Sequence, residues 1–496
     1  MSTHDLPHMS SLSSTDALRI SGYFIAIYLI YAVLSAIYNA YFGPLSKFPG
    51  PLSRKLSRLP ELYTLYHGDE ASELVRSHSK AIYGFRKHGQ ASLQKDPQFY
   101  GKSFNNVDGI ITANDANHSR QRKLLSHTFA DKTLKDLEPL LKSWVEKMRK
   151  KVDILKYYNC TTFDIMGDLS FSEGLDMLEN SEYSSWVKTI FLGIKIDSRI
   201  RACKMINWFT EWFVNNFIMN NAKVSSAWSQ MRMVVLTCRS ATRSVCKYTS
   251  ITTTQYKESI AGLQRTPDRP DLWTKILEKS KGPDGLSIKE HHSNASTFMV
   301  AGTETTATAL SGVTYHLLRN PEYLQKLTQA IRGSHSSSED ITMESLQHLK
   351  YLHAVLQEGL RMYPPVPSML PRRVPKGGAI VCDEFLPKGT SIGVHHLSTY
   401  RSEDNVKDPY KFAPERWLGD EKYKDDHLDS LEPFSVGPRN CIGKNLAWHE
   451  MRLILATTLF NFDLKLCEES KKWTDQKVYT LWEKIPLMVT LAPAAR

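Results

Sequence analysis

One cysteine stands in a short segment whose composition suits a metal ligand. Residues 434–443 read FSVGPRNCIG, with Cys441 near the end, and an apolar helical pattern follows at 446–460. Gly437 and Pro438 favour a turn, so a helix would begin at about Cys441. Its first turn would offer unpaired backbone N–H groups and the positive end of the helix dipole, which lower the pKa of a thiol. Such a thiolate could hold a soft metal; the ordinary alternative is a small buried side chain.

An acid and a hydroxyl follow a glycine on a long predicted helix. Apolar periodicity covers residues 288–319, and Asn320-Pro321 stops it. Gly302 inside this helix costs about 1 kcal/mol relative to alanine, so it needs a reason. From the helix alone, Glu304 and Thr305 are an exposed acid and a hydroxyl that bonds back to the helix backbone.

Glu358 and Arg361 form a charge pair on another predicted helix, over residues 343–362, which Pro364-Pro365 stops. On a helix surface this spacing contributes only about 0.2–0.5 kcal/mol. A leucine stripe lies away from both charges, at positions 346, 349, 352, 356 and 360. Spacing alone therefore favours a solvated pair.

The elements that must position these residues are mostly helices. Residues 379–394 alternate with Gly and Pro in the manner of short strands, and no repeat is present. We therefore predict a mainly α fold with small β-sheets. The sequence has no dinucleotide-binding, phosphate-loop, nucleophile-elbow or H-E-x-x-H motif, so a redox enzyme of this sequence would not carry its own dinucleotide site.

The composition excludes several classes of protein. The chain has 496 residues, a net charge of +11 and 41% hydrophobic residues. Its mean hydropathy of −0.36 excludes a polytopic membrane protein. Seven cysteines without a C-x-x-C motif argue against a disulfide scaffold or a zinc module. No run of five basic residues occurs, so we expect no nucleic-acid partner; the basic excess suits an acidic partner or an anionic membrane surface.

The N-terminal segment, residues 1–46, resembles a membrane anchor. Residues 20–46 contain no charged side chain, and about 20 helical residues span a bilayer core. We predict one transmembrane helix at about 20–42 rather than a cleaved signal peptide. Basic residues are more frequent after the span than before it, which predicts a cytosolic domain over residues 47–496.

Four segments together resemble the cytochromes P450. Residues 434–443 match the haem-binding signature F-x-x-G-x-R-x-C-x-G, and 301–305 (AGTET) match the oxygen-binding groove motif. Residues 358–361 match E-x-x-R, and 412–417 (FAPERW) match the P-E-R-F type element. In detail, the sequence is most similar to filamentous-fungal members of secondary metabolism, such as isotrichodermin hydroxylase and versicolorin desaturase. The resemblance implies a cytochrome P450 fold behind the anchor.

The resemblance also implies a role for each site residue. Cys441 would be the axial thiolate ligand of haem iron, and Phe434 would pack beside its sulfur. The haem propionates would meet cationic or donor side chains, namely Arg439, His118, Arg122 and Arg372, with Arg373 a close rival of Arg372. Gly302 would mark a local opening of the helix for dioxygen, and Glu304 and Thr305 would deliver protons. Glu358, Arg361 and Arg416 would form a buried structural triad.

The chain departs from the family near residues 78–83. Similar members place two strands of a main sheet there, whereas this sequence runs from 78–82 directly to Tyr83-Gly84. Two strands of about 5–6 residues each are missing, which would leave partner strands with an open edge. The loss is either a true deletion or a mis-spliced gene model.

The resemblance implies a haem-dependent monooxygenase that takes electrons from NADPH through a separate cytochrome P450 reductase. It would hydroxylate, epoxidise or desaturate an apolar small molecule in fungal secondary metabolism. The expected location is the endoplasmic reticulum membrane, single-pass, with a cytosolic catalytic domain. The alternative is a haem-binding protein with impaired activity because of the missing strands. Expected substrate-lining positions are Phe298, Ala301, Thr305, and residues 366–369 and 106–112.

Overall fold

The computed structural model describes most of the chain in two compact units, residues 1–63 and 64–496. Within them the described residues are 14–48, 50–68, 79–85, 92–101, 107–131, 134, 138, 152–171, 175–180, 198–202 and 272–494. The first unit contains helices α1 (Ser14–Tyr41) and α2 (Leu52–Leu56), which contact each other. Helix α3 (Leu59–His67) spans the division between the units.

The uncharged N-terminal stretch is helical, as α1. Among the residues that the structure describes, no helix has the length and apolar character needed to cross a membrane. The transmembrane span expected at about 20–42 is therefore not confirmed.

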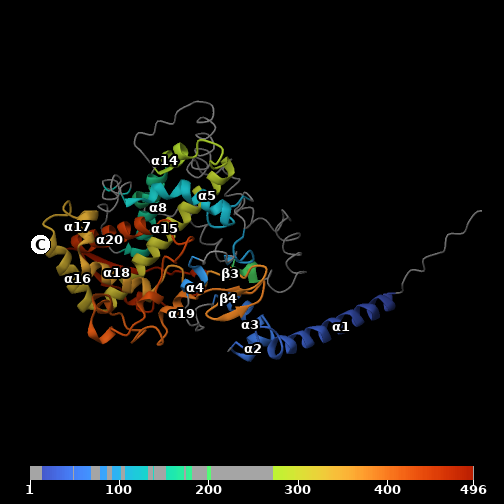
Figure 1. Cartoon of the computed structure of the whole chain (residues 1–496). Helices are drawn as coiled ribbons and strands as arrows, with labels where there is room; N and C mark the ends of the chain where they lie inside the picture. Colours follow the sequence, from blue (N-terminus) through green and yellow to red (C-terminus); the bar gives the residue numbers. More distant parts are fainter. Residues whose placement is uncertain are drawn as a thin grey trace, which may run out of the picture. The chain divides into compact units, whose positions relative to one another are not determined.

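The second unit is dominated by helices (Figure 1). Its α-helices after α3 are α4 (Ser79–Tyr83), α5 (Asp115–Leu125), α8 (Ile154–Phe171), α9 (Met177–Asn180), α14 (Leu272–Lys279), α15 (Ile288–Arg319), α16 (Pro321–Ser334), α17 (Met343–Gln347), α18 (Lys350–Met362), α19 (His396–Tyr400) and α20 (Lys444–Asn461). Short 3-10 helices, including η2 (Ser126–Phe129), η4 (Pro414–Leu418), η5 (Glu421–Tyr423), η6 (Leu428–Ser430) and η7 (Glu468–Ser470), connect them. The prediction of a mainly α fold is confirmed.

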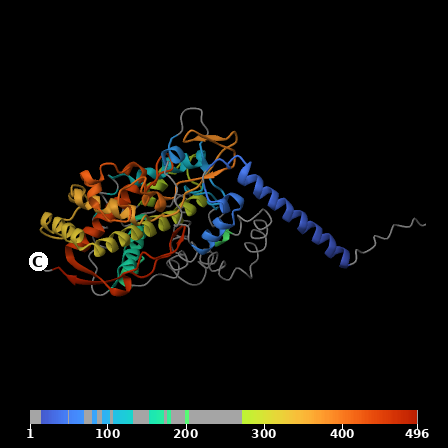
Figure 2. The ribbon, with the colours of Figure 1, turned by 90° about the horizontal axis from the view of Figure 1, so that it is seen from below.

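Helix α15 confirms its predicted bounds because both ends carry strong signals. A capping box begins it, in which the Ser287 hydroxyl accepts the Glu290 N–H and the Glu290 carboxylate accepts the Ser287 N–H. Asn320-Pro321 ends it, since proline cannot continue a helix. Figure 2 shows α15 as the long helix coloured yellow-green to yellow.

The predicted helix over residues 343–362 is two helices. Helix α17 ends at Gln347 and α18 begins at Lys350, with Leu349 in a non-helical conformation between them. The prediction of one continuous helix is wrong, because the apolar stripe persists through a break that no Gly or Pro marks.

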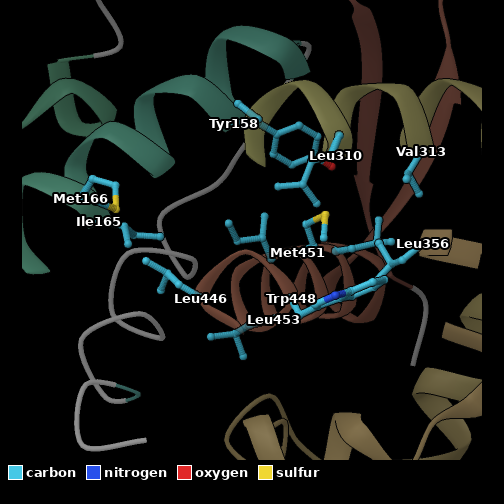
Figure 3. Close-up of a cluster of buried hydrophobic side chains, with 14 of the residues drawn as sticks. Tyr158, Ile165, Met166, Leu310, Val313, Leu356, Leu446, Trp448, Met451 and Leu453 are labelled. Atoms are coloured by element: carbon cyan, nitrogen blue, oxygen red, sulfur yellow. The ribbon is translucent and has the colours of Figure 1, made fainter. Parts of the chain in front are cut away.

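The core lies where α8, α15, α18 and α20 meet. Helix α15 packs against the other three. Figure 3 shows the side chains that fill this space, among them Tyr158 and Met166 of α8, Leu310 of α15, Leu356 of α18 and Met451 of α20. A packed core of this kind fixes α15 relative to α20, and therefore relative to the loop that precedes α20.

The strands form small sheets, as predicted. One sheet has the order β1 (Gln94–Lys95), β3 (Arg372–Arg373), β6 (Ser391–Ile392), and a second has the order β2 (Val152–Asp153), β10 (Met488–Pro493), β7 (Phe462–Leu466). Two hairpins complete the described strands, β4 (Ala379–Val381) with β5 (Glu384–Leu386) and β8 (Val478–Tyr479) with β9 (Leu481–Trp482). Residues 69–78 lie outside the described residues, so the loss of two strands near 78–83 stays a prediction.

Candidate functional site

A tight loop before α20 presents Cys441. Gly437 has a φ of +78°, and a Cβ there would lie 2.1 Å from the backbone oxygen of Tyr83, so only glycine fits. The Cys441 N–H donates to the Phe434 carbonyl at 2.8 Å, which closes the loop. Helix α20 begins at Lys444, so Cys441 precedes the helix and the expected place in its first turn is wrong.

The Cys441 side chain is exposed, although burial among surrounding protein atoms raises the pKa of its thiol above the ordinary value. A hydrogen bond from the Gly443 backbone and the charges of Arg122 and Lys444 act in the opposite direction but do not prevail. The lowered pKa predicted from the helix dipole is therefore wrong, because burial outweighs it. A bound metal cation would supply the missing stabilisation of the thiolate.

Arg122 of α5 forms hydrogen bonds to this loop. Its Nη1 donates to the Asn440 carbonyl at 2.7 Å and its Nη2 to the Asn440 side-chain oxygen at 2.6 Å. Asn114 caps the start of α5 by accepting the Asn117 N–H at 2.9 Å. The bidentate contact fixes Asn440, the neighbour of Cys441, more directly than it offers Arg122 to a ligand.

Arg439 contacts the first turn of α5, whereas Arg122 lies in its last turn. Its Nη2 donates to Asp115 at 2.8 Å and to the Ala113 carbonyl at 2.8 Å, whereas its Nη1 is buried without a partner. His118 of α5 is buried, and burial together with the charges of Arg439, Arg122 and Lys95 lowers its pKa to about 4. His118 is thus a neutral donor at physiological pH.

Arg372 and Arg373 differ in what they contact. Arg373 forms an ion pair with Asp96 at 2.5 Å, and its guanidinium also donates to Gln98. Arg372 is buried and donates to the Tyr100 hydroxyl at 3.2 Å, with no carboxylate partner among the described residues. Arg372 rather than Arg373 therefore remains available to an anionic ligand.

The cations around α5 form a cluster that outnumbers its acids. The pKa of Lys95, which lies in this cluster, is held well below its ordinary value by burial and by Arg372 and Arg439. Hydrogen bonds from Ser92, Arg439 and Gln94 hold the pKa of Asp115 below its ordinary value, although burial alone would raise it. Uncompensated charge of this density is costly unless an anion joins it.

The middle of helix α15 exposes Ala301 and Thr305 among buried neighbours. Ala301 is exposed and Thr305, four residues on, is partly exposed, whereas Thr303, Glu304 and Thr306 are buried. The Thr305 hydroxyl donates to the Ala301 carbonyl at 2.6 Å. Residues four apart share a helix face, so Ala301 and Thr305 form a small open surface.

The Glu304 side chain contacts residues away from the open face of α15. Its Oε1 lies 2.6 Å from Lys484 Nζ, and both side chains are about 95% buried. Burial raises the Glu304 pKa although Lys484 opposes the shift. Lys484 also donates to the Thr308 hydroxyl at 2.8 Å. The predicted proton-delivery residues thus lie on two faces of α15, with Thr305 at the open one.

Close helix packing explains why residue 302 is a glycine. A Cβ at this position would lie 2.8 Å from the sulfur of Met166 on α8. Helix α15 is continuous through Gly302, so the expected local opening is not visible. Gly302 lets α8 approach α15 closely, and its catalytic role stays a prediction.

Glu358, Arg361 and Arg416 are brought together as the resemblance implied. Arg361 donates to both carboxylate oxygens of Glu358, at 2.8 and 2.9 Å, and Arg416 Nε lies 3.1 Å from the same carboxylate. All three side chains are fully buried. Trp417 Nε1 adds a 2.9 Å hydrogen bond, and Arg416 also pairs with Asp426. The interpretation from spacing alone, a solvated pair, is wrong.

Two aromatic residues of the predicted site pack against other aromatic rings, and the predicted contact of Phe434 with the Cys441 sulfur stays a prediction. The ring of Phe434 packs against Trp448 of α20, with centroids 5.9 Å apart. Phe298 is buried between Phe129 and Trp273, with centroid distances of 5.2 and 5.8 Å. Phe298 therefore belongs to the core and does not line an open site.

Sequence reasoning missed Lys95, Trp417 and Lys484. The short strand containing Lys95 and the C-terminal segment containing Lys484 carry no motif. The only available signal for Trp417 was its place directly after Arg416 in the 412–417 element.

A family model decides what this arrangement is, because the model described as Cytochrome P450 matches residues 45–490. The chain belongs to the cytochrome P450 family. Its relatives include the cytochrome P450 monooxygenase efuB of Hormonema carpetanum, 41% identical over 95% of this chain and 96% of that protein. The cytochrome P450 monooxygenase astA of Talaromyces wortmannii is 37% identical over 95% and 96%. The chain is thus a cytochrome P450 monooxygenase, an oxidoreductase.

Haem, the cofactor of the cytochrome P450 family, fits the residues present. An exposed cysteine can supply the thiolate ligand, and the open Ala301–Thr305 face belongs to α15, which packs against α20, the helix that follows Cys441. The cation cluster, with the partnerless Nη1 of Arg439, suits the two carboxylates of haem. Cys441, Arg439, Arg372 and His118 are therefore the residues that would hold it, and Arg122 positions the cysteine loop.

Proposed function

We propose that this cytochrome P450 inserts oxygen from dioxygen into an apolar small molecule, with electrons from NADPH delivered by a separate reductase. The observation that carries the proposal is Cys441, presented on the Gly437 loop and followed by α20, in a chain whose cations around α5 outnumber the acids there. Bound haem would supply activation of dioxygen, with the thiolate pushing electron density onto the iron. The absence of a dinucleotide motif from the sequence supports a separate reductase.

Residues of this chain would orient substrate and move protons. Thr305 stands at the open face of α15 with a hydroxyl that can donate and accept. Ala301 leaves room beside it, since its side chain is one methyl group. Glu304, engaged by Lys484, would influence proton delivery from the neighbouring face rather than through direct contact at the open face.

The substrate class is proposed to be an apolar secondary metabolite of a fungus. The relatives are monooxygenases of fungi such as Talaromyces wortmannii and Aspergillus oryzae, which supports this origin. Hydroxylation, epoxidation and desaturation are all open to this site, because each starts from the same activation of dioxygen.

Turnover with isotopically labelled dioxygen tests the monooxygenase proposal. Purified enzyme, a fungal cytochrome P450 reductase, NADPH and a panel of terpenoid and polyketide substrates would yield a product carrying one labelled oxygen atom for each hydroxylation. The Cys441→Ala variant serves as the matched control and would give no product. Product formation that needs neither reductase nor dioxygen would contradict the proposal.

A second candidate function is haem binding with impaired turnover. The alignment with the Hormonema relative covers 508 positions, more than the 496 residues of this chain, so that relative carries residues absent here. Residues missing from this chain are what the expected loss near residues 78–83 requires, whether it is a deletion or a mis-spliced gene model. Sequencing the transcript across this region distinguishes a deletion from a mis-spliced gene model. Normal haem binding without product from any substrate would favour the second function.

We also propose that the N-terminal segment attaches the enzyme to the endoplasmic reticulum membrane with the catalytic domain in the cytosol. The uncharged stretch at residues 20–46 and the basic residues after it support this topology. Fractionation of cells expressing the full chain would place it in the microsomal pellet, resistant to alkaline extraction. Recovery of the full chain in the soluble fraction would contradict the proposal.

A further inference from the structure

Two like charges face each other across the β1–β3 strand pair. The antiparallel register pairs Lys95 directly with Arg372, and Gln94 with Arg373. Directly opposed residues on an antiparallel pair have Cβ atoms about 4.5–5.5 Å apart, and like charges at that spacing destabilise the sheet. The strand pair therefore concentrates positive charge at one spot.

The nearby acids are engaged elsewhere. Asp96 pairs with Arg373 and accepts a hydrogen bond from Ser391. Asp115 pairs with Arg439. Among the residues that the structure describes, no carboxylate forms an ion pair with Lys95 or Arg372.

The groups that do contact Lys95 are neutral. Its Nζ donates to the Ile111 carbonyl at 2.6 Å and lies 4.4 Å from the centroid of the Tyr100 ring. The Tyr100 hydroxyl accepts from Arg372, and burial raises the pKa of Tyr100, so this phenol stays neutral. An ammonium group has three donors, so Lys95 retains capacity for an anion.

Lys95 shares its surroundings with residues of the haem site. Burial and the charges of Arg372 and Arg439 lower the pKa of Lys95, and the charge of Lys95 in turn lowers the pKa of His118. Lys95 is half-buried, so its side chain is closely surrounded but remains partly accessible. The charge that would offset this cluster must come from outside the described protein atoms.

We propose that Lys95 is a further cofactor-binding residue, whose ammonium group pairs with a haem carboxylate together with Arg372. The inference rests on the proposed haem site. It explains why Lys95 and Arg372 stand opposed without an acid between them: bound haem would complete the cluster and convert repulsion into two charge-assisted contacts.

Release of haem from the purified holoenzyme to excess apomyoglobin measures the contribution of Lys95. Lys95→Met should release haem about tenfold faster than the wild type, the factor expected for one charge-assisted hydrogen bond. Lys95→Arg, which keeps the charge, should recover most of the retention. Lys376→Met is the matched control, because Lys376 is exposed in a turn, and should release haem at the wild-type rate.

Haem dimethyl ester, in which both carboxylates are esterified, identifies the interacting group. In enzyme reconstituted with the ester, Lys95→Met and the wild type should release the cofactor at the same rate. Equal release rates of Lys95→Met and Lys376→Met with ordinary haem would overturn the inference, as would equally fast release by Lys95→Arg and Lys95→Met.

The same samples distinguish failure of this inference from failure of the proposed haem site. A carbon-monoxide difference spectrum typical of thiolate ligation, present in the wild type and in Lys95→Met, would leave the site intact whatever the release rates are. Its absence from the wild type would overturn the proposed function and the inference together.

Discussion

Glu304 and Lys484 form a buried ion pair, with 2.6 Å between Oε1 and Nζ, although 180 positions separate them in the sequence. The second oxygen of Glu304, Oε2, is buried without a hydrogen-bond partner. Lys484 also holds the Thr308 hydroxyl, one turn further along α15. The pair therefore ties the C-terminal segment to the helix that carries Thr305, and it fixes Glu304 about 100° around the helix from that residue.

Lys484→Met should destabilise the protein strongly, because it leaves the Glu304 carboxyl group buried without its cation. The expected loss in the free energy of unfolding is about 3–5 kcal/mol, measured by urea unfolding. The double variant Lys484→Met/Glu304→Gln should recover much of the loss, since it removes both charges. Lys422→Met, which breaks the exposed pair with Asp408, should cost less than about 1 kcal/mol. Equal effects of the two lysine substitutions would contradict the buried pair.

Thr305→Ala should separate proton delivery from cofactor binding. The hydroxyl at the open face of α15 would be lost, so product formation should fall by about 100-fold, the usual effect of removing a proton-transfer group. Haem binding should persist, as judged by the carbon-monoxide difference spectrum. Thr303→Ala, at a buried position on the same helix, is the control and should keep its turnover. Unchanged product formation by Thr305→Ala would remove Thr305 from the catalytic residues.

Glu358→Gln should unfold far more readily than the wild type. The substitution leaves Arg361 and Arg416 buried beside a neutral amide, at a cost of about 3–5 kcal/mol. Glu421 offers a matched control, since it forms an i,i+3 pair with Lys424 but its side chain is 83% exposed. Glu421→Gln should change the free energy of unfolding by less than about 0.5 kcal/mol. A small effect at both positions would show that the triad contributes little.

Glu450 of α20 should make stability fall as the pH rises. Burial raises its pKa from the usual 4.5 to about 8, and the Thr306 hydroxyl nearby offsets this too little. Between these values the folded state keeps a proton that the unfolded state has lost, so the free energy of unfolding decreases with pH. Glu450→Gln should be more stable than the wild type at pH 8, by on the order of 4 kcal/mol, and this advantage should vanish near pH 4.5. Parallel pH profiles of the two proteins, measured by thermal unfolding, would contradict a neutral Glu450.

The sequence predicted those parts of the fold that local signals determine. The bounds of α15 follow from Ser287, Glu290 and Asn320-Pro321, all of which act within a few residues. The break between α17 and α18 has no such signal and was missed. The signature identified Cys441, but it did not predict the pKa of its thiol. That pKa depends on burial by residues distant in the chain, and burial outweighs the effect of the helix N-terminus.

Residue spacing could not predict which charged side chains from distant parts of the chain lie together. Spacing alone favoured a surface pair for Glu358 and Arg361, whereas the resemblance implied the buried triad with Arg416 that the structure contains. The ion pair of Glu304 with Lys484 and the facing like charges of Lys95 and Arg372 each join separate elements, so only the three-dimensional structure brings them together. Whether such charged groups interact strongly depends on their burial. Hydrophobic periodicity predicts which face of a helix is apolar, but it does not predict which charged side chains are buried.

The central claim, that Cys441 supplies a thiolate to haem iron, is tested most directly by the carbon-monoxide difference spectrum of the reduced protein. The wild type should show the red-shifted Soret band of thiolate-ligated haem. Cys441→Ala should lose this band, whereas Cys467→Ala, which removes a cysteine distant from the loop in sequence, should keep it. A wild-type spectrum like that of a histidine-ligated haem, or a red-shifted band that survives in Cys441→Ala, would contradict the claim.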